Sequence, residues 1–400
     1  MLGRAPFTAE SDREPFRADV AVVGGGPIGL AVAWRCAVRG RRVAVYDPDP
    51  GVGGADGVAG GALASGGGAD EVAGAVFAAG RGAYQVAAGM LAPVAEAYFG
   101  EEALTRLLTE SARRWPAFAA ELSEVSGLDL GYRTEGTLVV GLTSDDVAEA
   151  RRLWSYQQDL GLPITPLRPA QLRAYEPLLA PGVRGGAHAP GDHQIDPRRL
   201  VAALRVAADR AGVAFIRDTV TDLSAVDAPT VVVAAGCGAA ALTGLPVRPV
   251  KGQILRLRAP GGAAPGFRHV VRGYVDGWTV YLVPRTDGEV VVGATVEERV
   301  DDAVTAGAVL RLLRAAADLM PEIAEYELVE AQVGMRPGTP DNAPIIGRLP
   351  DRPEVIVATG HYRHGILLTP VTADLVADLL STGVPDPAMV PFTPDRFVTD

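Results

Sequence analysis

The chain has 400 residues, of which 48% are hydrophobic and 21% are charged, and its formal net charge is −11. This composition is typical of an ordinary soluble globular protein, and the length predicts at least two domains around a large core. The acidic balance, without any basic stripe, argues against a nucleic-acid partner and against binding to an anionic membrane surface.

Cysteine and histidine usage gives no sign of a metal centre. Cys36 and Cys237 belong to no CxxC pair, and the five histidines show no HExxH spacing. We therefore expect no metal, no disulfide framework and a reducing, cytoplasmic compartment. Residues 1–17 lack the apolar region of a signal peptide and are expected to be a flexible tail. No apolar run approaches the ~18–20 residues that a membrane span requires.

Residues 19–29, DVAVVGGGPIG, are the most informative segment of the chain. An apolar strand leads into a G-x-G-x-x-G turn, in which the first glycine allows a tight bend and the second allows backbone to approach a pyrophosphate. The third lets the following helix pack on the strand. These glycines are Gly24, Gly26 and Gly29. Pro27 and Ile28 then begin a helix whose unpaired N–H groups attract negative charge.

A second apolar strand lies within residues 41–50 and ends at Asp47. This carboxylate follows the glycines by a little over ~20 residues, where an acidic side chain accepts hydrogen bonds from ribose hydroxyls. An Asp at this position favours an unphosphorylated ribose. The residues by themselves thus predict FAD or NAD rather than NADP, and the alternative is a glycine-rich turn without a ligand.

Residues 51–83 consist almost entirely of Gly, Ala, Val and Asp. Such a segment has few large side chains to bury, so it predicts a poorly ordered insertion. We interpret it as a tolerated insertion, and a lid is the alternative. Hydrophobic periodicity then predicts helices and strands in alternation. The helices are expected at 101–125, 145–160 and 197–211, and the strands at 136–143, 184–190 and 213–223. Residues 230–242 are expected to form a buried strand that leads into a helix through glycines.

The pattern changes over residues 247–296, where apolar and polar residues alternate between turns. This period predicts antiparallel strands with one half-exposed face. A helix at 306–321 leads to a strand, a turn and a helix at 354–381. We expect a mixed α/β fold, in which a Rossmann-like dinucleotide-binding domain is built from separated segments and a substrate domain is inserted twice. The dinucleotide-binding domain is expected to comprise residues 18–50, 84–130, 185–245 and 327–385. The substrate domain is expected to comprise residues 131–184 and 246–326, and residues 386–400 are expected to form a C-terminal tail.

Six motifs follow one another along the chain in this order: GGGPIG, AAGML, VKGQ, YLVPR with VVGAT, GMRPGTPDNAPIIG and ATGHYRHGILLTP. In this respect the chain resembles the D-amino-acid-oxidase-like FAD-dependent amine oxidases, and within them the glycine oxidases of the thiamine pathway. The resemblance runs from about residue 18 to residue 381, and its C-terminal motifs are the specific ones. It implies FAD as the cofactor. No cysteine neighbours Met335 in the sequence, where sarcosine-oxidase relatives attach flavin, so the FAD is expected to be non-covalent.

The resemblance also implies three substrate-binding residues. Arg336 matches the arginine that clamps the substrate carboxylate, which suits the two parallel hydrogen bonds of a guanidinium. Tyr281 matches a tyrosine that contacts the same carboxylate, and Arg363 matches a second arginine beside the pocket. The alternative for Arg336 is an arginine at a surface strand-to-loop junction without a ligand. The alternative for Tyr281 is an aromatic side chain that only packs across neighbouring strands. We interpret Arg285 and Lys251 as structural charges.

The implied cofactor contacts lie in several segments. The α-helix that begins at Pro27 would face the pyrophosphate, Asp47 the ribose and Val220 the adenine, and residues 88–90 would lie against the isoalloxazine. Residues 361–367 are expected to begin the last helix, whose N–H groups would face the flavin pyrimidine. Besides Gly24, Gly26, Pro27, Ile28 and Gly29, the full set is Asp47, Pro48, Gln85, Ala88, Gly89, Met90, Val220, Gly236, His361, Tyr362, Arg363, His364, Gly365, Ile366 and Leu367.

The activity implied is oxidative deamination of glycine, and of sarcosine or small D-amino acids, with O2 as the second substrate. The imine or glyoxylate, ammonia and hydrogen peroxide are the products, the imine would feed thiazole synthesis, and no side chain acts as acid or base. The alternatives are another small-amine or D-amino-acid oxidase, a dehydrogenase that reduces a quinone, a non-catalytic FAD-binding protein and an NAD-dependent dehydrogenase. A homo-oligomer is compatible with the sequence, which leaves the oligomeric state open.

Overall fold

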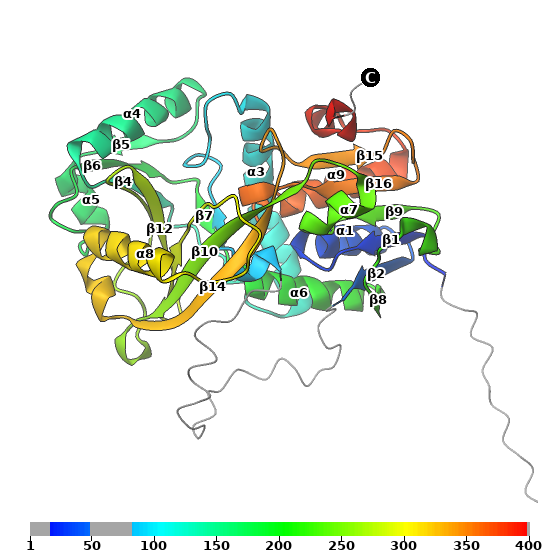
Figure 1. Ribbon diagram of the computed structural model, residues 1–400, viewed down its shortest axis with the longest axis horizontal. Helices are drawn as coiled ribbons and strands as arrows, with labels where there is room; N and C mark the ends of the chain where they lie inside the picture. Colours follow the sequence, from blue (N-terminus) through cyan, green and yellow to red (C-terminus); the bar gives the residue numbers. More distant parts are fainter. Residues whose placement is uncertain (1–16, 49–81, 398–400) are drawn as a thin grey trace, which may run out of the picture.

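The computed structural model describes residues 17–48 and 82–397 and contains two large sheets side by side (Figure 1). One is a six-stranded sheet with the order β15-β16-β9-β1-β2-β8. Its neighbouring strands run parallel, except for the antiparallel pair β15 and β16. Its strands are β1 (Val20–Val23), β2 (Val43–Asp47), β8 (Ala214–Arg217), β9 (Val231–Val233), β15 (Ile345–Arg348) and β16 (Val355–Thr359).

Both faces of the six-stranded sheet are buried. In β1, Val20 and Val22 join a core beneath the helices, whereas Ala21 and Val23 join a second core on the opposite face. This division follows from the alternation of side chains along a strand, and it explains why β1 is a continuous apolar run. The helices on the first core are α1 (Pro27–Val38), α3 (Glu102–Ser126), α6 (Pro197–Arg210) and α9 (Thr369–Thr382), and α7 (Ala239–Thr243) lies on the second.

The eight-stranded sheet has the order β14-β10-β13-β12-β11-β4-β6-β5. Only β11 and β4 are parallel neighbours in it. Its strands are β4 (Thr137–Gly141), β5 (Thr165–Leu167), β6 (Gly185–Ala189), β10 (Arg248–Arg258), β11 (Val270–Val275), β12 (Trp278–Pro284), β13 (Glu289–Gly293) and β14 (Glu327–Gly338). Around it lie α4 (Ser144–Asp159), α5 (Pro169–Tyr175) and α8 (Ala306–Leu319), and a small sheet pairs β3 (Met90–Leu91) with β7 (His193–Gln194). The predicted mixed α/β fold is confirmed.

The expectation that one face of this sheet is half exposed is wrong. Helix α8 covers one face, where Leu312 and Leu319 pack with Val292. On the other face, Val291 packs in a cluster that includes Ala88, from the segment before β3. The strands predicted by the alternating pattern are present, but burial of both faces of the sheet depends on segments that are distant in the sequence.

Two segments that were assigned to the dinucleotide-binding domain contribute strands to the eight-stranded sheet. Strands β6 and β14 fall within the predicted segments 185–245 and 327–385, yet they pair with β4 and β10 in the eight-stranded sheet. Strand partners are chosen by non-local backbone pairing, which apolar patterning does not encode. The division into domains with the stated boundaries otherwise stays a prediction.

The C-terminal part also differs from expectation. Helix α9 begins at Thr369 rather than at His361, because residues 361–368 contain a separate 3-10 turn. Residues 386–397, expected to belong to a tail, form two 3-10 turns in which Met389 and Phe392 are buried in the core. The predicted N-terminal tail up to residue 16 and the insertion up to residue 81 lie outside the described residues.

Candidate active site

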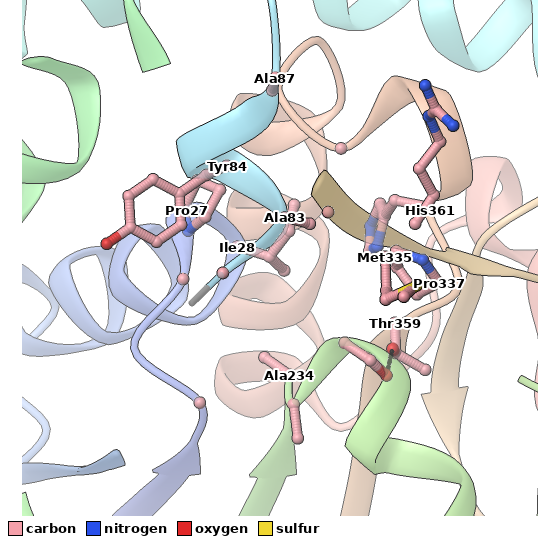
Figure 2. A pocket seen from close by; sticks show the side chains of 18 of the residues that line it. Pro27, Ile28, Ala83, Tyr84, Ala87, Ala234, Met335, Pro337, Thr359 and His361 are labelled. Atoms are coloured by element: carbon pink, nitrogen blue, oxygen red, sulfur yellow. Dashed lines mark hydrogen bonds between the residues drawn. The ribbon is translucent and has the colours of Figure 1, made fainter. Parts of the chain in front are cut away.

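A cavity of about 630 Å³ is lined by residues from both sheets. At one end lie the start of α1 and Asp47, and at the other end lie Tyr281 and Arg336. Figure 2 shows Pro27 and Ile28 at the α1 side of this cavity, with Met335 and His361 on the side opposite them. The cavity therefore connects the predicted nucleotide site with the predicted substrate site.

The start of α1 is built to receive an anion. Gly26 caps the helix without any side-chain hydrogen bond, and no acidic residue stands in the first turn. A Cβ on Gly26 would meet no atom within 4 Å, so a ligand can approach the backbone there. The free N–H groups at a helix start carry partial positive charge and bind phosphate. This end of the cavity fits a pyrophosphate.

The other two glycines of the motif serve the chain itself. Gly24 has a φ of +113°, and a Cβ there would lie 2.5 Å from the carbonyl oxygen of Ala234. A Cβ on Gly29 would overlap the carbonyl oxygen of Gly24. Gly29 does not line the cavity. Its position fits the predicted role, which is to let the helix pack closely on the strand.

Asp47 ends β2 beside the glycine turn. Its Oδ2 accepts a hydrogen bond from the backbone N–H of Gly25 at 2.6 Å, and Asp47 also lines the cavity. The carboxylate is thus fixed next to the site where the pyrophosphate fits, as the ribose position requires. Together with the uncapped helix start, these residues fit a bound dinucleotide such as FAD.

The cavity is also walled by residues 85–88, whose carbonyl oxygens accept hydrogen bonds from three arginines. The carbonyl oxygen of Gln85 accepts hydrogen bonds from Arg198 at 3.3 Å and from Arg256 at 3.1 Å. Arg285 donates to the carbonyl oxygens of Ala88 and Ile195. Burial lowers the pKa of Arg285 to about 10. These arginines donate hydrogen bonds to main-chain carbonyl oxygens, which agrees with the interpretation of Arg285 as a structural charge.

Arg336 on β14 and Tyr281 on β12 form the opposite end. Arg336 Nη1 donates to the carbonyl oxygens of Thr295 at 3.1 Å and of Lys251 at 3.4 Å, and the guanidinium lies where a Cβ on Gly252 would be. Among the described residues, no carboxylate forms an ion pair with Arg336. A guanidinium beside a cavity that is held by carbonyl oxygens and forms no ion pair with a described carboxylate is suited to an anionic ligand.

The environment of Tyr281 keeps its hydroxyl protonated. Burial raises the pKa of Tyr281, and the positive charge of Arg336 opposes that rise without cancelling it. The hydroxyl lies 2.5 Å from where a Cβ on Gly293 would stand, so the glycine makes room for it. A neutral phenol is a hydrogen-bond donor, which suits it to a carboxylate oxygen.

Most of the predicted site residues meet at this cavity. Those that line it are Gly24, Gly26, Pro27, Ile28, Asp47, Pro48, Gln85, Ala88, Gly89, Met90, Val220, Gly236, Tyr281, Arg336, His361, Tyr362, Arg363, Gly365 and Ile366. Gly29, His364 and Leu367 do not line it. The carbonyl oxygen of Leu367 instead accepts hydrogen bonds from Ser111 and Trp115 in the helical core. Arg363 is exposed, and its guanidinium lies 5.3 Å from the centre of the Tyr362 ring.

Sequence reasoning missed several lining residues, of which Glu96 is the most chemically significant. A carboxylate five residues after the AAGML motif gives no signal in the sequence, because its partners are far away along the chain. Cys237 is also closer to the flavin-attachment position than the sequence indicated, since its Sγ lies 3.8 Å from the carbonyl oxygen of Met335. Its thiol is not among the lining groups, and burial raises its pKa to about 11.

Residues 17–48 and 82–397 lack two kinds of feature. No helix there has both the length and the apolar character needed to cross a bilayer. The same residues contain no group of three or more His, Cys, Asp or Glu side chains arranged to hold a metal ion.

Comparisons with known proteins agree with this geometry. The family described as FAD dependent oxidoreductase (DAO) matches residues 19–379. The chain is 32% identical to a glycine oxidase of Geobacillus kaustophilus, across 96% of this chain and 98% of that protein. The crystal structure of glycine oxidase from Geobacillus kaustophilus aligns with a TM-score of 0.81 and covers 96% of this chain and all (100%) of that one.

Two other relatives have different names. The chain is 33% identical to the bifunctional protein ThiO/ThiG of Synechocystis, over 95% of this chain but only 54% of that protein. It therefore spans about half of that relative. It is also 28% identical to the hydrogen cyanide synthase subunit HcnC of Pseudomonas aeruginosa, over 95% of this chain and 96% of that protein.

Proposed function

We propose that this chain, which belongs to the FAD dependent oxidoreductase family, oxidises glycine and other small amino acids to the corresponding imines. The motif resemblance found in the sequence is confirmed by the family match and by the glycine oxidase relative. The imine is hydrolysed to glyoxylate and ammonia, or feeds thiazole synthesis as the resemblance to thiamine-pathway enzymes implies. O2 is the final electron acceptor and gives hydrogen peroxide.

One observation carries the proposal: a single cavity joins the anion-binding start of α1 to the Arg336 guanidinium. FAD bound along this cavity supplies the two-electron acceptor that amine oxidation needs. The glycine turn, Asp47 and the segment 85–90 would hold the FAD without a covalent bond. The substrate would then be bound where the cavity meets β12 and β14.

Arg336 and Tyr281 give the substrate its orientation. The guanidinium fork donates two charge-assisted hydrogen bonds to a carboxylate, and the Tyr281 hydroxyl donates a third. With the carboxylate fixed at this end, the Cα–H of a small amino acid points towards the middle of the cavity, where the reactive ring would lie. Positioning is then the main contribution of the chain, and no side chain needs to act as a general base.

The test is spectroscopic. Purified protein should be yellow, and anaerobic glycine should bleach the flavin absorbance, with peroxide and glyoxylate formed after air is admitted. Bleaching by sarcosine or a D-amino acid but not by glycine would transfer the proposal to that substrate. Turnover with an artificial dye but not with O2 would indicate a dehydrogenase. A yellow protein that no small amine bleaches would contradict the enzymatic proposal.

A further inference from the structure

A second charged group faces the same cavity as Arg336. Glu96 follows β3, lines the cavity, and has a side chain that is only 10% exposed. Its Oε1 accepts a hydrogen bond from Arg272 Nη1 at 2.8 Å, and its Oε2 lies 3.3 Å from His364 Nδ1. The assignment of substrate-binding residues to Tyr281, Arg336 and Arg363 leaves this carboxylate without a role.

Glu96 is ionised despite its burial. Burial alone would raise the pKa of Glu96, but the His364 ring and the Arg272 guanidinium hold that pKa well below its ordinary value. Arg363 contributes in the same direction. A negative charge therefore faces the cavity that the positive charges of Arg336 and Arg363 also line.

The position of Glu96 is fixed through its backbone. Asp192 Oδ1 accepts a hydrogen bond from the Val94 N–H at 2.9 Å, and Asp192 Oδ2 accepts one from the Ala95 N–H at 2.8 Å. Both bonds are buried, and Asp192 itself does not line the cavity. The backbone just before Glu96 is thus anchored by two buried hydrogen bonds.

Glu96 lies near the carboxylate clamp. Arg272, whose guanidinium donates to Glu96, is the direct partner of Tyr281 across the β11–β12 pair, so the side chains of Arg272 and Tyr281 lie on the same face of the sheet. The charges of Arg336 and Glu96 also both act on the Tyr281 hydroxyl. An α-amino acid carries a negative carboxylate and a positive ammonium on adjacent carbon atoms. A site with a guanidinium and a carboxylate around one short cavity end is complementary to that pair of charges.

We propose that Glu96 binds the amino group of the substrate, so that Glu96 and Arg336 together select an amino acid over a simple carboxylate. A carboxylate can accept about four hydrogen bonds, and the contacts of Glu96 with Arg272 and His364 leave capacity for the amino group. This inference rests on the proposed function, because it assumes that an amino acid is the substrate. It assigns the discrimination between amino acid and carboxylate to one residue that was not among the expected ones.

The experiment compares glycine with acetate, which lacks the amino group, in the FAD-loaded protein. The binding of acetate is measured by calorimetry, and that of glycine by anaerobic flavin reduction at several concentrations. In the Glu96→Gln variant, glycine should bind about 10- to 100-fold more weakly, because a hydrogen bond between charged groups is lost. Acetate should bind equally well or more tightly, because a negative charge near its own carboxylate has been removed.

A structural role for Glu96 predicts a different pattern. If the substitution merely disturbs the cavity, glycine and acetate weaken in the same proportion, which would overturn the inference. Asp192→Asn is the matched control: it loosens the backbone before Glu96 while keeping the Glu96 charge, so glycine and acetate affinities should move together. If Glu96→Gln and Asp192→Asn change the ratio of glycine to acetate affinity by the same factor, the inference is likewise overturned.

Two further outcomes are distinguishable. If Glu96→Gln does not retain FAD, Glu96→Asp gives the answer, because it keeps the charge but retracts it by one methylene. The ratio of glycine to acetate affinity should then fall in part, and an unchanged ratio contradicts the inference. A wild-type protein that binds FAD and acetate but neither binds nor oxidises any amino acid contradicts the proposed function itself.

Discussion

The two ends of the cavity are lined by different kinds of groups. At the nucleotide end, the ligand would meet backbone N–H groups and glycines that lie within one short segment, from β1 to the start of α1. At the substrate end it would meet charged and polar side chains such as Arg336, Tyr281 and Glu96, which come from distant parts of the chain. The first end should therefore respond to added side-chain volume, and the second to removed charge.

The largest effect is expected from a methyl group on Gly29. A Cβ there would overlap the carbonyl oxygen of Gly24, which is backbone and has no room to move. Gly29→Ala should therefore abolish folding of the holoprotein, measured as the yield of soluble, FAD-containing protein. Gly26→Ala is the control, since its Cβ meets nothing within 4 Å. It should keep the fold and weaken only FAD binding, and equal damage by both substitutions would contradict the close-packing role of Gly29.

Removal of the guanidinium at position 336 should have the next largest effect. Arg336→Ala is expected to lower kcat/KM for glycine by about 10²- to 10⁴-fold, because two charge-assisted hydrogen bonds are lost. The effect should appear chiefly in KM, and the FAD content should stay unchanged. Arg336→Lys keeps the positive charge but not the two-pronged guanidinium, so its kcat/KM for glycine should lie between those of the wild type and Arg336→Ala. Normal glycine oxidation by the alanine variant, measured with an oxygen electrode, would refute the clamp.

The buried carboxyl of Asp192 predicts a pH dependence of stability. Burial raises the pKa of Asp192 to about 7, from 3.8. Between these values the folded protein binds a proton that the unfolded chain does not, so the free energy of unfolding should fall as the pH rises from about 4 to about 7. The decrease would reach about 4 kcal/mol at most. Urea unfolding measured across this pH range should show the free energy of unfolding falling with pH in the wild type and changing less in Asp192→Asn. Identical pH dependence in the two proteins would contradict the raised pKa of Asp192.

Asp47 offers the smallest expected effect. Asp47→Asn keeps an acceptor for the Gly25 N–H but removes the charge that would face the ribose hydroxyls. The affinity for FAD, measured by fluorescence as flavin is added to apoprotein, should fall by about 10-fold. Glycine KM in the FAD-saturated enzyme should not change, because this residue stands at the opposite end of the cavity. A change in KM without a change in FAD affinity would argue against the ribose position.

The elements that sequence patterning placed well are those whose signals are local. Residues 101–125 and 306–321 were expected as helices, and the structure has α3 and α8 there. The start of α9 was misplaced because the turn at residues 362–364 precedes it, and a turn of this kind depends on Tyr362 adopting a φ of +48°. Apolar periodicity carries no information about such a backbone conformation.

By itself, the sequence determined the nucleotide end of this protein. The strand, the glycines and Asp47 lie within about 30 residues of one another, so their spacing encodes their geometry. Only the tertiary structure decided the surroundings of Glu96, because Arg272 lies 176 positions away and reaches it from the eight-stranded sheet. The membership of β6 and β14 in that sheet was decided in the same way. Contacts between distant segments form only when the whole chain packs, and no local pattern of residues records them.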